Sequence, residues 1–194
     1  MRRVILVHGF ASPFSGRYDI DRLAPFWTAA GYEVVQFDYG FRLFVSLGND
    51  KWAKRLADMA EPGDTVCAHS NGCLVAQKAS LRWVAPANEA LRKAPFDRLV
   101  FLCPALDSDA PIGDQVRRVD VWYAPHDLPV RIGGLFPKHP WGPMGAVGYT
   151  GPDRRVVNHN RESFQYSIKS YTHLDLLYDR SKLNYFGPLI VAES

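Results

Sequence analysis

The sequence predicts an α/β protein with a predominantly parallel, twisted sheet that carries helices on both faces. Short apolar runs typical of buried strands alternate along the chain with segments whose apolar residues follow helical spacing. The strand-like runs are continuously apolar, as expected when helices cover a sheet on both sides. At 194 residues the chain has the length of one domain, so we expect a single domain over 1–194.

The N-terminal part supplies the first two predicted strands. A strand is predicted at residues 3–7, and a helix follows over 23–30, where apolar side chains recur at helical spacing and Gly31 suits the C-cap. A second strand at 33–38 precedes another helical stripe at 52–59. The order strand, helix, strand, helix is that of a parallel sheet.

The same alternation continues through the rest of the chain. A third strand at 65–69 leads into a helix over 71–83, and further strands are predicted at 98–103, 120–123 and 155–159. A late helix is indicated by three spaced apolar residues: Phe164, Ile168 and Tyr171. Ligands of parallel sheets bind beyond the carboxyl ends of the strands, so each loop that follows a strand is a candidate for the site.

Composition and charge exclude several classes of protein. The 23 basic and 20 acidic side chains give a net charge of +3 without a basic cluster, so we expect no nucleic-acid partner. No apolar run is long enough for an integral membrane segment, and the run at 4–7 is too short for a signal peptide. Metal-ligand spacings are absent, so we expect no metal and no cofactor. Reduced thiols and a cytoplasmic location are favoured by three cysteines within predicted core elements: Cys67, Cys73 and Cys103.

The strongest local pattern is Ala68-His69-Ser70-Asn71-Gly72, between the strand at 65–69 and the helix after it. A serine at such a turn is held in a strained backbone that projects its hydroxyl over the sheet edge, as a nucleophile requires. Crowding demands small residues two positions before and after, and Ala68 and Gly72 satisfy it. The turn also places the Asn71 N–H at a helix N-terminus, where it suits an oxyanion. The Asn71 side chain is a candidate for a polar contact with substrate.

The end of the first strand, Val7-His8-Gly9-Phe10, has two interpretations. It is either a tight turn in which Gly9 provides backbone freedom, or the source of a second oxyanion donor, the Phe10 N–H. We favour the second interpretation because one such donor can contribute about 10²- to 10³-fold in rate.

A nucleophilic serine needs an acid and a base, which follow it along the chain in that order in this architecture. Asp127 lies just past a predicted strand and is favoured over Asp107, which follows the preceding one. Three histidines follow the acid and are candidates for the base: His139, His159 and His173. Order alone does not choose among them.

The chain resembles the α/β-hydrolase superfamily, and is most similar to its small, lidless bacterial lipases and esterases. The resemblance rests on Val7-His8-Gly9, the elbow with Ala68 in first place, Asp127 soon after Tyr123, and the segment from His173 to Leu-Leu-Tyr. It implies a minimal fold with no cap domain, and the stretch 103–119 is indeed too short to hold one.

By that resemblance the triad is Ser70, Asp127 and His173, with oxyanion donors at Phe10 and Asn71. The implied activity is hydrolysis of carboxylic esters of a small-molecule acyl substrate through an acyl-enzyme. Thioester or amide cleavage on the same triad remains open, as does a catalytically silent binding protein of this fold. The oligomeric state is open as well.

Two segments are candidates for the substrate pocket. Half of the residues in 133–152 are Gly or Pro, which predicts a loop without a helix, placed over the active site. Its Trp141 and Tyr149 are predicted to bind substrate, with Phe41 and Phe44 forming a second wall. The alternative is that the aromatics of the loop only pin it to the core.

Overall fold

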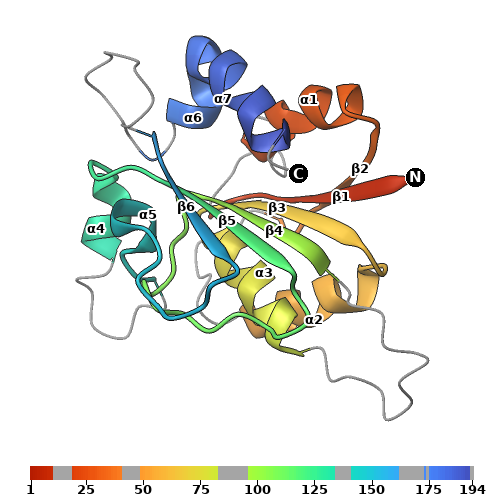
Figure 1. The fold of residues 1–194 in the computed structure, drawn as a ribbon, viewed down its shortest axis with the longest axis horizontal. Helices are drawn as coiled ribbons and strands as arrows, with labels where there is room; N and C mark the ends of the chain where they lie inside the picture. The colour runs from red at the N-terminus through yellow and green to blue at the C-terminus, as the bar shows by residue number, and fades with distance from the viewer. Residues whose placement is uncertain are drawn as a thin grey trace.

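A six-stranded, all-parallel sheet forms the centre of the molecule (Figure 1). The structure is a computed structural model that describes residues 1–10, 19–40, 49–82, 96–133, 141–161, 173 and 175–192. The strand order is β2-β1-β3-β4-β5-β6. The bounds are β1 Arg2–Val7, β2 Tyr32–Phe37, β3 Asp64–His69, β4 Phe96–Leu102, β5 Arg118–Tyr123 and β6 Val156–Asn160. The predicted fold class is confirmed.

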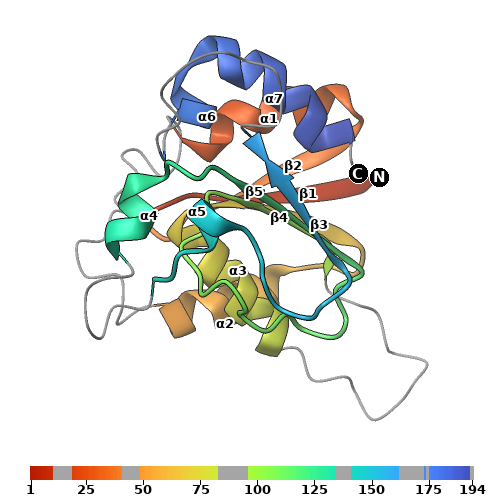
Figure 2. The same ribbon diagram turned by 60° about the vertical axis from the view of Figure 1, so that its left-hand side comes forward.

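Helices cover both faces of the sheet (Figures 1 and 2). On one face lie α2 (Asn49–Met59) and α3 (Asn71–Arg82). On the other lie α1 (Ala24–Ala29), which follows the short 3-10 helix η2 (Ile20–Leu23), and α7 (Arg180–Ala192), which follows α6 (Asp175–Tyr178). The layering is therefore helix, sheet, helix.

The strand sequences explain why both faces are covered. Successive side chains of a strand point to opposite faces, and in β1 the last four residues are all buried. Ile5 and Val7 pack into the core beneath α2 and α3, whereas Val4 and Leu6 pack into the core beneath α1 and α7. A strand that is apolar on both sides is stable only in such a sandwich.

Each predicted strand is present, with bounds that differ by at most two residues. The helices at 23–30, 52–59 and 71–83 are confirmed, whereas the helical stripe at 164–171 lies outside the described residues. Two expectations are wrong. The segment 133–152 contains a one-turn helix, α5 (Met144–Val147), and sequence analysis missed α7, whose Gly187 and Pro188 disguise its helical spacing.

The carboxyl ends of the strands lie at the same side of the sheet as α4 (Leu128–Gly133) and α5, on the left of Figure 1. Between β4 and β5 every residue is described, and this stretch forms turns rather than helices. No helix in the described part of the chain is both long and apolar enough to cross a membrane.

Candidate active site

Ser70 occupies the single-residue turn between β3 and α3, and its φ is 52°, a left-handed value that is costly for a residue with a side chain. Both of its backbone groups are held: the N–H donates to Leu102 at 3.0 Å, and the carbonyl accepts from Cys73 at 3.1 Å. Strained backbone that neighbours hold this firmly is a feature of functional sites. Ser70 therefore lies on a strained, well-held turn between a strand and a helix.

Two glycines allow the turn to approach its neighbours. A Cβ on Gly72 would lie 2.4 Å from the carbonyl oxygen of His8 and 2.6 Å from that of Val7. A Cβ on Gly9 would lie 3.2 Å from Cβ of Ser70. The ends of β1 and β3 thus touch through positions where a side chain has little or no room, and this contact brings the Phe10 backbone next to the serine turn.

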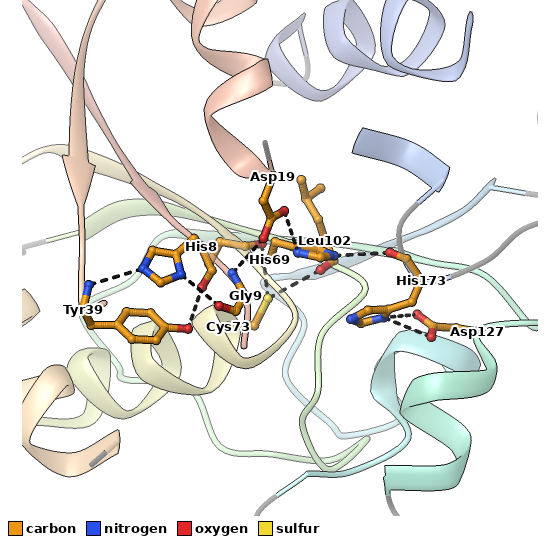
Figure 3. A network of polar contacts seen from close by, with 10 residues as sticks. His8, Gly9, Asp19, Tyr39, His69, Cys73, Leu102, Asp127 and His173 are labelled. Carbon is orange, nitrogen blue, oxygen red and sulfur yellow. Dashed lines mark hydrogen bonds and ion pairs between the residues drawn. The ribbon is translucent and has the colours of Figure 1, made fainter. Parts of the chain in front are cut away.

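His173 faces Asp127 at the carboxyl end of β5 (Figure 3). Nδ1 of His173 lies 3.0 and 2.9 Å from the two carboxylate oxygens, and Asp127 is fully buried. The same carboxylate accepts the Val130 N–H at the start of α4. A histidine held through Nδ1 keeps Nε2 available as a base. Burial lowers the pKa of His173, and the hydrogen bond to Asp127 opposes that effect.

The rival candidates lie in other surroundings. Asp107 is exposed on the loop after β4. His159 on β6 is paired with the buried Asp120, with Nε2 2.8 Å from Oδ1, and stacks on Trp122 at 4.4 Å between ring centroids. His139 lies outside the described residues.

A cavity of about 290 Å³ joins the predicted nucleophile and base. Its walls are mostly apolar and come from six segments: Phe10, Ser70, Ala105, Pro129, Val130, Trp141 and His173. The volume is at the lower end of the range for small-molecule pockets. Sequence analysis missed Ala105, Pro129 and Val130, although the latter two lie only two and three residues after the predicted acid.

The two predicted oxyanion donors lie at the ends of β1 and β3. Phe10 lines the cavity. Asn71 is the first residue of α3, so its N–H has no acceptor within the helix. The Asn71 side chain is fully buried and does not line the cavity, so the expected polar contact with substrate is wrong. Its Oδ1 instead accepts from Trp141 Nε1 at 2.9 Å and thereby fixes the indole.

The predicted substrate-binding residues separate into three groups. Trp141 lines the cavity and meets Phe10 edge to face at 5.3 Å. Tyr149 does not line it; its ring packs against the core, and its backbone pairs with the Asn158 side chain on β6. Phe41 and Phe44 lie outside the described residues.

A second aspartate–histidine pair lies beside the first (Figure 3) and was missed by sequence analysis. Nδ1 of His69, the residue before Ser70, lies 2.8 Å from Oδ1 of Asp19, a close charge contact without hydrogen-bond alignment. Burial lowers the pKa of His69, but the charge of Asp19, its contact with Nδ1 and the neighbouring Cys103 together outweigh that effect and raise the pKa to about 10. The elbow motif contains His69, but no pattern indicates a partner fifty residues earlier.

One group of side chains in the described ranges is close enough to share a metal ion. Ligand atoms of His69, Cys103 and His173 lie within 4.8 Å of one another. Both imidazoles, however, face a carboxylate through Nδ1, and Nε2 of His69 lies 3.3 Å from the carbonyl oxygen of His173. These contacts account for the arrangement, and we assign it no metal or cofactor.

Comparison with known proteins identifies the fold. No family model and no curated protein matches the chain. Among solved structures, the esterase domain of a Rhodothermus marinus protein shares 15% identity over 99% of this chain and 85% of its own, with a TM-score of 0.54. A putative hydrolase of the α/β superfamily from Xanthomonas campestris pv. campestris shares 15% identity over 99% of each chain, with a TM-score of 0.54. An extracellular α/β-hydrolase from a Paenibacillus species shares 13% identity over 99% of this chain and 98% of its own, with a TM-score of 0.57. The chain has the α/β-hydrolase fold.

Proposed function

We propose that the protein is a serine hydrolase that cleaves carboxylic esters of small acyl groups through an acyl-enzyme. The observation that carries the proposal is one cavity that is lined by both Ser70, on its strained turn, and His173, which is paired with a buried carboxylate. Solved structures of similar fold include proteins described as esterases, which supports the same class of reaction.

In the proposed first step, Ser70 Oγ attacks the ester carbonyl while His173 Nε2 accepts the serine proton. Asp127 keeps the proton of the imidazole on Nδ1, so that Nε2 is the free base, and stabilises the imidazolium that forms. The negative charge on the carbonyl oxygen is stabilised by the N–H groups of Phe10 and Asn71. His173 then returns the proton to the leaving alcohol.

The second step reverses these roles with water as the nucleophile. His173 takes a proton from water as it attacks the acyl-serine, and Ser70 Oγ leaves with that proton. The acyl chain lies against the apolar walls, among them Trp141 and Val130. A cavity of about 290 Å³ favours short or medium chains over long ones.

The test is covalent labelling and turnover of Ser70→Ala beside the wild type. A fluorophosphonate should label the wild type at Ser70 and leave the variant unlabelled, and hydrolysis of 4-nitrophenyl acetate should fall by about 10⁴- to 10⁶-fold. Parallel assays with a thioester and an anilide of the same acyl group establish which bond is preferred. If Ser70→Ala keeps a tenth of wild-type turnover, Ser70 is not the nucleophile. If the folded wild type shows no turnover, the proposed hydrolase function is wrong.

A further inference from the structure

The buried pair Asp19 and His69 contacts three of the loops that form the candidate site (Figure 3). Oδ2 of Asp19 accepts the Gly9 N–H at 3.0 Å, next to the predicted oxyanion donor of Phe10. Nδ1 of His69 lies 2.8 Å from Oδ1 of Asp19, and Nε2 of His69 donates to the carbonyl oxygen of His173 at 3.3 Å. His69 is itself adjacent to the nucleophile.

Stability alone is a poor reason for this pair. Asp19 is 3% exposed and His69 2%, and the desolvation cost of a buried ion pair roughly cancels its attraction. Apolar side chains of similar volume would fill the same space at no such cost. What they would not supply is a donor aimed at the His173 backbone, an acceptor for Gly9, and a positive charge beside the base.

We propose that Asp19 and His69 are a positioning pair that fixes the Gly9–Phe10 backbone and the His173 backbone relative to Ser70 and holds a positive charge against the base. The proposal rests on the serine-hydrolase function above and deepens it. Rings of His69 and His173 lie 4.9 Å apart between centroids, so the charge acts at short range. Misplacement of a catalytic group by about 1 Å typically costs about 100-fold in rate.

Four ionisable groups lie around His173, and the pair supplies two of them. Asp127 faces Nδ1, His69 faces the ring, Asp19 lies behind His69, and Cys103 is within 4.8 Å. Burial lowers the pKa of His173, Asp127 raises it, and the charge of His69 lowers it again by more than Asp19 raises it. The pair thus keeps His173 unprotonated, and so active as a base, to lower pH.

Two conservative variants test the pair against a matched control. Asp19→Asn retains an acceptor for Gly9 but removes the negative charge that keeps the buried His69 protonated, and His69→Gln removes the cation directly. Each should lower kcat by about 10- to 100-fold while KM for 4-nitrophenyl acetate changes less than threefold. Each should also move the acid limb of the kcat/KM profile to higher pH. His159→Gln, which breaks a buried aspartate–histidine pair that does not line the cavity, should change neither quantity.

The charge on His69 is also measurable in the unaltered protein. Nitrogen-15 NMR should show both ring nitrogens of His69 protonated at pH 8, so the proposal is testable even if the variants do not fold. A neutral His69 at that pH overturns the proposal, as do folded variants with wild-type kcat and acid limb. Absence of wild-type turnover above that of Ser70→Ala is a separate result, which rejects the hydrolase function instead.

Discussion

Three of the described histidines lie 2.8–2.9 Å from an aspartate oxygen, and their surroundings give them different properties. His173 borders the cavity opposite Ser70, His69 lies beneath it as a buried cation, and His159 stacks on Trp122 at the edge strand β6. What each histidine can do therefore depends on the groups that surround the rest of its ring. A pairing with a carboxylate is by itself no sign of a catalytic base.

The difference between two of these histidines gives a prediction at the residue scale. His173→Ala should lower kcat by about 10⁴-fold or more, because Ser70 loses its base. His159→Ala should leave kcat within about threefold of the wild type, since its partner Asp120 also binds Arg98 and Arg118. Steady-state kinetics with 4-nitrophenyl acetate measure both. The reverse order of effects would make His159 the base.

At the scale of elements, the junction of β3 and α3 is the part of the site with least room for change. Ser70 can adopt its strained turn only while α3 starts close beneath the end of β1. That approach depends on the bare backbone of Gly72. The close packing of α3 against β1 and the backbone geometry of Ser70 therefore both depend on the absence of a side chain at Gly72.

We expect Gly72→Ala to lose both stability and activity. Its new methyl group would lie 2.4 Å from a backbone oxygen, which cannot rotate away, so the junction must open at a cost of about 1–3 kcal/mol or more. Urea unfolding measures the loss, and fluorophosphonate labelling measures the nucleophile. Lys78→Ala in the same helix, which breaks only a surface ion pair with Asp50, is the control. Equal stability of the two variants would refute the packing argument.

The segment from Trp141 to Tyr149 divides its aromatic residues between pocket and core, which gives a prediction about acyl chains. In the wild type, kcat/KM should rise with chain length until the cavity is full, because each buried methylene contributes about 0.8 kcal/mol. Trp141→Ala should flatten this rise and spare the acetyl ester. Tyr149→Ala should keep the rise. Measurement of kcat/KM for a series of 4-nitrophenyl esters of increasing chain length tests both variants. A uniform loss of kcat/KM across the series in Trp141→Ala would mean that the indole supports the fold and not the substrate.

At the scale of the whole molecule, the sequence predicts the framework better than the site. Strand positions could be predicted because buried parallel strands are continuous apolar runs, and Ser70 because the elbow is a local pattern. That Ala105, Pro129 and Val130 line the cavity depends on how the ends of separate strands meet in space, and a local sequence pattern carries no information about this. Asp19 is missed for the same reason, since its partner lies fifty residues away.

The buried cation gives the molecule a pH dependence of stability. The pKa of His69 is about 10 in the folded protein and about 6.5 when unfolded, so the stability it contributes is complete below about pH 6.5 and is lost as pH rises through 10. The free energy of unfolding of the wild type should therefore fall between these values more steeply than that of His69→Gln. Urea unfolding at intervals of half a pH unit checks this. Parallel curves for the two proteins would contradict it.

The all-parallel sheet also governs how the chain reaches its native state. Because parallel neighbours need a crossover, no pair of strands can form from a hairpin; Val4 of β1, for example, pairs with Thr65 of β3. Such non-local pairing makes folding slow compared with helical bundles. The ends of β1, β3 and β5 meet only when the centre of the sheet is complete. A partly folded chain therefore has buried helices and strands before the candidate site is assembled, and any activity of that site is expected among the last properties to appear.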